Sequence, residues 1–171
     1  EQKGPWLITC DHARNHVPVA INGGSLGLSV CEMQRHIAYD VGAEGLSLAL
    51  GKYLQSPVLC SNFSRLVIDP NRGEDDPTLL MKVYDGTLIP ANRNTDAADV
   101  ERRLEAYHRP YHKAYSELAT SDRAIVAVHS FTPRLKGRSP RPWEIGILFA
   151  KDRRLADLTI ARLQARGNLT V

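Results

Sequence analysis

Two short apolar runs on either side of a helical pattern constrain the fold more than any other feature of this sequence. The runs are residues 6–10 and 58–60, and apolar side chains recur at helical spacing between residues 34 and 55. A strand–helix–strand unit of this kind closes with a right-handed crossover and pairs its strands in parallel. The sequence therefore predicts an α/β fold.

The rest of the chain continues this alternation. The apolar run at 124–128 is the most convincing buried strand, and it leads directly into His129 and Ser130. We predict further strands at 66–68, 145–149 and 168–171, and an irregular segment over 74–93 that could act as a lid. We also predict a helix from residue 95 or 96 to 118 with a kink at Pro110. A last helix is expected over 153–166, capped by Gly167.

Composition narrows the class of protein. The 171 residues fit one domain, no apolar run approaches a membrane span, and no signal peptide is apparent. The cysteines form no CxxC pair, which favours reduced thiols and a cytoplasmic location. The net charge is +3, and the basic run at 134–141 lacks interleaved aromatic residues. It favours a solvated loop that attracts small anions over a nucleic-acid surface.

Histidines follow two of the predicted strands. His12 comes just after the first run and His129 directly after 124–128, so both are expected at the same edge of the parallel sheet. A catalytic zinc site uses three such ligands, and Asp40 is our choice for the third, with Asp11 and Asn15 as competitors. Strand-end histidines also hydrogen-bond loops, so the spacing leaves both interpretations open.

Two other segments could carry chemistry. Arg65 and Arg72 flank the run at 66–68, where their planar forks could grip substrate carboxylates. Spacing alone favours the alternative, a turn capped by Asp69 and Asn71 with both arginines solvated. His108 and His112 are four residues apart, but Pro110 interrupts their face and no HExxH glutamate is present. His112 remains a candidate for contact with the substrate. No G-x-S-x-G, P-loop or G-x-G-x-x-G motif is found.

Six blocks, taken in order, resemble the N-formylglutamate amidohydrolase family. They are Cys10-Asp-His-Ala-x-Asn-x-Val-Pro18, His36-Ile-Ala-Tyr-Asp-Val-Gly-Ala43, Ser64-Arg-Leu-Val-Ile-Asp-x-Asn-Arg72, Asp85-Gly-Thr-x-Ile-Pro-x-Asn-Arg93, Pro110-Tyr-His112 and His129-Ser-Phe-Thr-Pro133. The resemblance spans nearly the whole chain and implies a three-layer α/β/α scaffold with a central mixed, largely parallel sheet, like that of zinc carboxypeptidases.

The resemblance also implies a function. A Zn²⁺-dependent enzyme of this type would cleave an N-formyl or N-acyl amino acid, such as N-formylglutamate in histidine degradation. The implied metal ligands are His12, Asp40 and His129, and the implied substrate contacts are Arg65, Asn71, Arg72, His112 and Ser130.

Relatives that resemble this chain continue beyond residue 171 into a strand that carries their general base. We therefore expect residues 1–171 to be a single hydrolase domain without its C-terminal part, and Glu144 is the substitute candidate for the base. Two other functions stay open: a non-catalytic protein that binds acidic amino acids, and a zinc peptidase that acts on other peptides.

Overall fold

The computed structural model describes residues 4–171, which form two compact units. The first unit runs to Phe131 and contains the sheet, and the second comprises Thr132–Val171. Each unit is described by itself. A single hydrolase domain over residues 1–171 remains a prediction. Among the helices described from residue 4 onward, none combines the length and apolarity needed to cross a bilayer.

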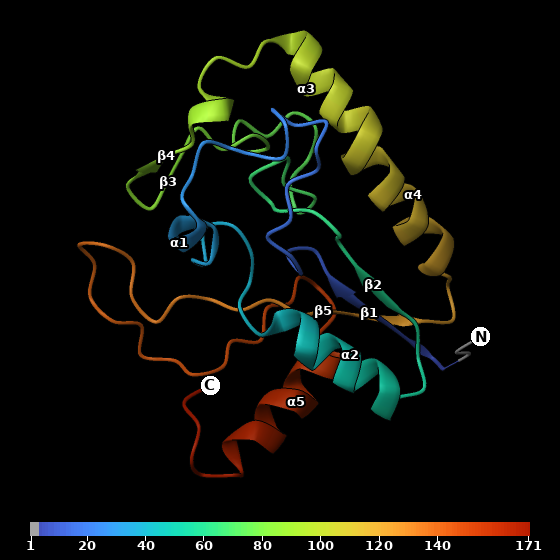
Figure 1. Ribbon diagram of the computed structural model, residues 1–171. Coiled ribbons are helices and arrows are strands. Elements are labelled where there is room, and N and C mark those ends of the chain that lie inside the picture. The colour runs from blue at the N-terminus through green and yellow to red at the C-terminus, as the bar shows by residue number, and fades with distance from the viewer. Residues whose placement is uncertain (1–3) are drawn as a thin grey trace. The chain divides into compact units, whose positions relative to one another are not determined.

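A three-stranded parallel sheet organises the first unit. β1 (Trp6–Cys10) lies between β2 (Val58–Cys60) and β5 (Ala124–Ala127), in the order β2-β1-β5 (Figure 1). Both pairings are parallel, as the strand–helix–strand pattern predicted. Because β1 and β5 are neighbours, the residues that follow them meet at one edge of the sheet.

β5 is less buried than its sequence predicted. It is an edge strand whose residues are mostly exposed, and Ile125 keeps 43% of its surface accessible. Residues 145–149, the apolar run expected to form another strand, contain no strand in the structure. An apolar run indicates a strand that could be buried, but its burial depends on what pairs with it.

α2 (Ala43–Tyr53) begins nine residues later than the helix predicted from residue 34. A short capped helix, α1 (Val30–Met33), precedes it, and turns connect the two. Gly42 adopts a left-handed φ of 82° at the N-cap, a conformation that glycine tolerates best. The apolar periodicity before it reflects burial of Ile37 and Ala38 in the core rather than a helical face.

The run at 66–68 is fully buried but forms a turn instead of the predicted strand. Side chains satisfy its backbone in place of a neighbouring strand. Asn92 donates to the Leu66 carbonyl at 2.8 Å, and Arg103 donates to the Val67 carbonyl at 2.9 Å. Local sequence could not reveal these partners, because they lie 26 and 36 residues away.

The segment 74–93 is irregular for most of its length, as predicted, but it also contains an unpredicted hairpin. β3 (Val83–Tyr84) pairs antiparallel with β4 (Thr87–Leu88), and a short 3-10 helix follows at Pro90–Asn92. Asp85 and Gly86 connect the strands with φ values of 43° and 74°. Asp-Gly is a strong signal for this two-residue turn, so the sequence did carry the information.

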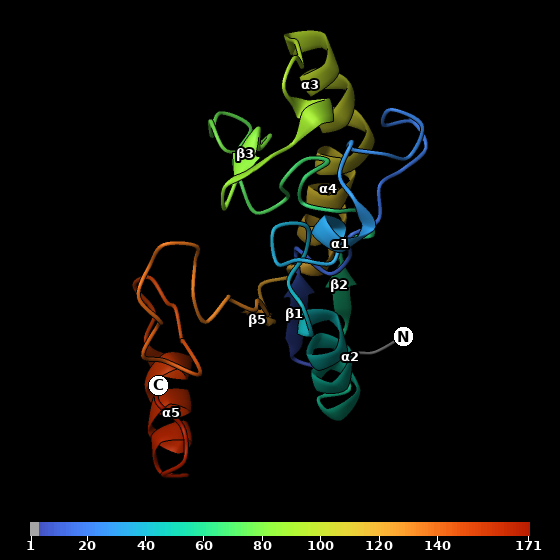
Figure 2. The same ribbon diagram turned by 60° about the vertical axis from the view of Figure 1, so that its left-hand side comes forward.

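The long helix predicted from residue 95 or 96 is present as one continuous rod in Figures 1 and 2. Asp96 caps α3 (Ala97–Arg103), a π-helical stretch follows at Leu104–His108, and α4 (Arg109–Leu118) completes it. Pro110 lies in the first turn of α4. Since proline has no N–H to donate, the wider π-helical turn accommodates it at the place where a kink was predicted.

The second unit contains α5 (Arg154–Gln164), which matches the predicted helix within two residues at each end. Gly167 follows it with a φ of 71°, as expected of a C-terminal cap. The strand predicted at 168–171 does not form. Instead, the Thr170 carbonyl accepts hydrogen bonds from the backbone N–H groups of Glu144 and Ile145 at 3.0 and 3.2 Å.

Candidate metal centre

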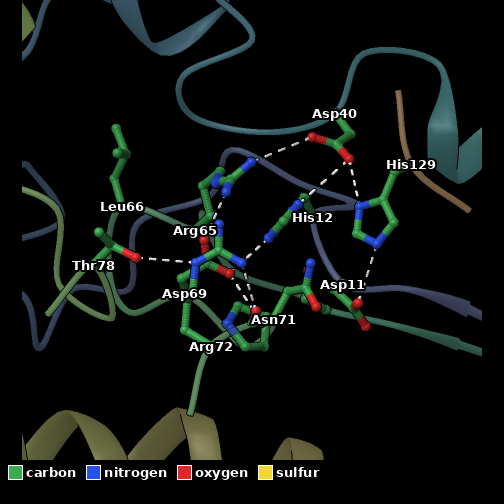
Figure 3. A network of polar contacts seen from close by, with 12 residues as sticks. Asp11, His12, Asp40, Arg65, Leu66, Asp69, Asn71, Arg72, Thr78 and His129 are labelled. Atoms are coloured by element: carbon green, nitrogen blue, oxygen red, sulfur yellow. Dashed lines mark hydrogen bonds and ion pairs between the residues drawn. The ribbon is translucent and has the colours of Figure 1, made fainter. Parts of the chain in front are cut away.

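Three side chains from distant parts of the first unit converge at the end of the sheet. His12 follows β1, His129 follows β5, and Asp40 lies in the turn before α2 (Figure 3). One ligand atom from each lies within 4.8 Å of the others. The structure therefore brings together the three residues that the sequence analysis selected as metal ligands.

One carboxylate oxygen is the meeting point of both imidazoles. Asp40 Oδ2 lies 3.4 Å from His12 Nδ1 and 2.9 Å from His129 Nδ1, and the two ring centroids are 5.1 Å apart. The backbone N–H of Ser130 donates to the same oxygen at 3.2 Å. The two Nδ1 atoms thus face the same point from neighbouring strand ends.

The backbone of β1 positions the aspartate directly. The N–H of Asp40 donates to the carbonyl of His12 at 2.8 Å, and the N–H of Ala43 donates to the carbonyl of Asp40 at 3.1 Å. The first bond fixes the turn against the strand end, and the second joins it to α2. Asp40 is placed by this turn, just outside the helix, rather than on a helix face as predicted.

Each imidazole has a second carboxylate on its other nitrogen. Asp69 Oδ1 lies 2.7 Å from His12 Nε2, and Asp11 Oδ2 lies 3.3 Å from His129 Nε2. With Nε2 engaged in this way, Nδ1 of each ring is the nitrogen available for a metal. The sequence analysis missed the role of Asp69, although it lies in the Asp-Pro-Asn turn, and treated Asp11 only as a competing ligand.

The two outer carboxylates are themselves held. Asp69 is fully buried and accepts hydrogen bonds from Arg65 Nη2 at 2.7 Å and from the backbone N–H of Asn71 at 2.9 Å. Asp11 accepts a 2.5 Å hydrogen bond from the Tyr111 hydroxyl, which α4 supplies. Both histidines are therefore fixed by chains of contacts that reach well beyond the centre.

The electrostatics favour ionised carboxylates beside the two imidazoles. Burial raises the pKa of Asp40, but its hydrogen bonds with His12 and His129 outweigh burial and hold that pKa well below its usual range. Hydrogen bonds with Asp11 and Asp40 raise the pKa of His129 to about 9. Burial likewise raises the pKa of Asp69, and contact with His12 more than reverses it. The centre is built to hold positive charge.

The arginine expected to bind substrate points inward. Arg65 is only 7% exposed, and besides Asp69 it has Asp40 at 3.7 Å from Nη1. The structure therefore places Arg65 as a partner of the buried carboxylates, and its contact with substrate remains a prediction. Arg72 is more accessible and donates to the Thr78 hydroxyl at 3.0 Å and to the Asn71 carbonyl at 2.9 Å.

The helix histidines support the turn that carries these residues. His112 Nε2 lies 3.0 Å from the Pro70 carbonyl, and His108 Nε2 lies 2.9 Å from the Arg72 carbonyl. Their ring centroids are 4.4 Å apart. Both imidazoles thus contact the turn through its backbone, and neither belongs to the metal-ligating group found among the described residues.

Other candidates lie in different surroundings. Asn15, a competing ligand, donates its side-chain amide to the Met33 carbonyl at 2.8 Å. His36, four residues before Asp40, lies 3.4 Å from Asp85 of the hairpin turn. Glu144 belongs to the second unit, where its exposed carboxylate accepts a 2.5 Å hydrogen bond from the Thr170 N–H. Its role as general base is untested by this geometry.

The donor set suits zinc. Two imidazole nitrogens and a carboxylate oxygen are the ligand types of catalytic zinc sites, which leave a fourth position open. Ligands on a tetrahedral zinc ion lie about 3.4 Å apart, given bonds of about 2.0–2.2 Å. The separations of the two Nδ1 atoms from Asp40 Oδ2, 3.4 and 2.9 Å, are close to that value.

Comparison with known proteins finds a family and a similar structure. The sequence model of N-formylglutamate amidohydrolase matches residues 4–171. The chain belongs to this family. It also matches the crystal structure of gene product Atu2144 from Agrobacterium tumefaciens at 35% identity with a TM-score of 0.91, covering 99% of this chain and 68% of that one. A search among curated proteins finds no match.

The family match covers all six sequence blocks and points to N-formylglutamate amidohydrolase activity. Three of these blocks supply His12, Asp40 and His129, and a fourth supplies Arg65 and Asp69. These blocks thus supply the polar network at the end of the sheet (Figure 3).

Proposed function

We propose that this chain is a zinc-dependent amidohydrolase that releases formate from an N-formyl amino acid, with N-formylglutamate as the first substrate to test. The observation that supports this most is the convergence of His12 Nδ1, His129 Nδ1 and Asp40 Oδ2 in a member of the N-formylglutamate amidohydrolase family. Such an activity would belong to cytoplasmic histidine degradation.

His12, Asp40 and His129 would hold the ion. When bound, zinc supplies a Lewis acid that polarises the amide carbonyl and lowers the pKa of water. Asp69 and Asp11 keep the Nε2 atoms of the two rings occupied, which directs both Nδ1 lone pairs to the ion. Arg65 balances the charge of Asp69 and Asp40, so that these two buried carboxylates can lie in one small site.

The substrate would be a small anion. The turn that follows Asp69 adjoins the centre through the contact of Asp69 with His12, and it carries Asn71 and Arg72. Because Arg65 is already paired with buried carboxylates, Arg72 is the better placed of the two arginines to bind a substrate carboxylate. His112 and Ser130 adjoin this turn and Asp40 respectively, and Arg65 could contribute a second cationic group.

A proton acceptor completes the reaction, because the attacking water must lose a proton and the leaving amine must gain one. We propose Glu144 for this role. We further propose that the complete scaffold has the three-layer α/β/α arrangement of zinc carboxypeptidases, and the parallel sheet β2-β1-β5 together with the family match supports this.

Metal analysis and substrate assays test the proposal together. The purified protein should retain about one zinc ion per chain and release formate from N-formylglutamate faster than it hydrolyses N-acetylglutamate or short peptides. His12→Ala and His129→Ala should each lose metal and activity, while His16→Ala, at an exposed histidine, should keep both. Carboxylate binding without metal or turnover would favour the non-catalytic alternative, and faster peptide cleavage would favour a peptidase.

A further inference from the structure

A pair of thiols lies directly behind the metal centre. Cys10 and Cys60 are the last residues of β1 and β2 and are register partners in the parallel pairing. Partners in register point to the same face of a sheet. Both cysteines are free. The next two residues after Cys10 are Asp11 and His12 of the centre.

The two thiols differ in access to solvent. Cys10 is completely buried, whereas Cys60 is half-buried and lines a cavity of about 500 Å³ beside Tyr107 and Tyr111. A small reagent entering this cavity can therefore reach Cys60 and not Cys10. The interaction with the neighbouring Cys10 thiol also lowers the pKa of Cys60, which favours the nucleophilic thiolate form there, and raises the pKa of Cys10. An accessible thiol with a second thiol beside it is the arrangement of redox-sensing cysteines.

We propose that Cys60 is an oxidation site for small hydroperoxides and that Cys10 resolves it as a disulfide. In the first step the Cys60 sulfur attacks the peroxide, the O–O bond breaks, Cys60 becomes a sulfenic acid and an alcohol or water leaves. In the second step the Cys10 sulfur attacks the Cys60 sulfur, the S–O bond breaks and water leaves with the Cys10 proton. The thiols are oxidised by two electrons and the peroxide is reduced.

The backbone permits this bond and links it to the centre. Neighbouring strands lie about 4.8 Å apart, which falls inside the Cα separation that disulfides span, about 4.4–6.8 Å. The bond nevertheless needs a Cβ separation of about 3.8 Å, so the two strand ends must approach by roughly 1 Å. Because Cys10 precedes Asp11 and His12 and packs with Ala13 and Ala43, this movement displaces the ligand-bearing end of β1. The disulfide should therefore weaken metal binding.

Mass spectrometry tests the modification itself, independently of the proposed enzymatic activity. Reduced protein treated with hydrogen peroxide should lose the mass of two hydrogen atoms, yield a Cys10–Cys60 cross-linked peptide, and recover fully with dithiothreitol. Cys31→Ser is the matched control, because Cys31 is exposed on α1 and should not affect the cross-link. Cys10→Ser should instead accumulate a sulfenic acid on Cys60 that dimedone captures.

Absence of the Cys10–Cys60 peptide in the wild-type protein, or a cross-link that depends on Cys31, would overturn the proposal. This readout needs no variant to fold. Coupling to the centre is measured by competition for Zn²⁺ with a chromogenic chelator. Oxidation should weaken Zn²⁺ binding about tenfold in the wild-type protein. The Zn²⁺ affinity of the Cys60→Ser variant should be the same before and after oxidation. Equal Zn²⁺ affinity of the oxidised and reduced wild-type protein would refute the coupling.

Discussion

Replacing Asp69 by asparagine isolates the contribution of a carboxylate that supports the metal centre without being one of its three predicted ligands. Asp69 is fully buried and accepts hydrogen bonds from Arg65 and from the Asn71 N–H, while its Oδ1 lies 2.7 Å from His12 Nε2. Asparagine keeps the shape and one acceptor oxygen but removes the charge. Its NH₂ group must then face either the guanidinium or the imidazole.

Two effects of different size are expected. Loss of one member of a buried ion pair costs about 3–5 kcal/mol, a large part of the ~5–15 kcal/mol by which a domain is stable. Arg65 keeps a second carboxylate, Asp40, at 3.7 Å, so we expect the lower end of that range. A lost outer contact to a ligating histidine weakens metal binding about 10–100-fold, or roughly 1.4–2.8 kcal/mol.

Urea unfolding of the metal-free protein and Zn²⁺ competition on the folded protein measure the two effects separately. Asp157→Asn provides a matched control, because Asp157 pairs with Arg153 in an exposed i,i+4 contact on α5. Such pairs contribute about 0.3–0.5 kcal/mol, so this variant should change stability slightly and leave Zn²⁺ affinity unchanged. If Asp69→Asn is folded and binds Zn²⁺ as tightly as the wild-type protein, Asp69 does not orient His12 and our account of the centre is wrong.

Three further predictions concern stability. The metal-free protein should lose stability as the pH rises from about 6.5 to about 9, because contacts with Asp11 and Asp40 raise the pKa of His129 from 6.5 to about 9. The stabilisation by protonated His129 is complete below pH 6.5 and lost above about pH 9. Urea midpoints that stay constant between these two pH values would contradict the prediction. Ile68→Ala should cost about 2–5 kcal/mol, since Ile68 is fully buried in the core, and the exposed Leu148→Ala should cost little. Gly42→Ala should cost about 1 kcal/mol, because Gly42 has a φ of 82° in open space. The comparison is Gly45→Ala, at a helical glycine with the same open surroundings, which should instead stabilise by about 0.5–1 kcal/mol.

Periodicity and motif order were sufficient for the framework and for the three residues that could bind an ion. Strands at 6–10, 58–60 and 124–127 were predicted almost to the residue because apolar runs that end in polar residues are a local signal. The parallel pairing followed from the connection between them. His12 and His129 could be placed together for the same reason, since residues that follow neighbouring parallel strands must share an edge.

Only the tertiary structure decided which of the buried segments are regular. The run at 66–68 looks like a strand, but Asn92 and Arg103 satisfy its backbone from a distant part of the chain. The helical periodicity before Gly42 arises from packing of a turn, and the burial expected of β5 did not appear at a sheet edge. These three features each depend on partners far away in the chain, which a local sequence pattern does not encode.

The same distinction separates the ligands of the centre from the residues that orient them. Metal-ligating residue types at strand ends can be recognised in the sequence, but the outer contacts cannot. Asp69 reaches His12 across 57 positions, and Tyr111 reaches Asp11 across 100. The sequence determined which groups could bind an ion. The fold decided which nitrogen of each imidazole lies against Asp40, because that choice rests on hydrogen bonds between segments that meet only after folding.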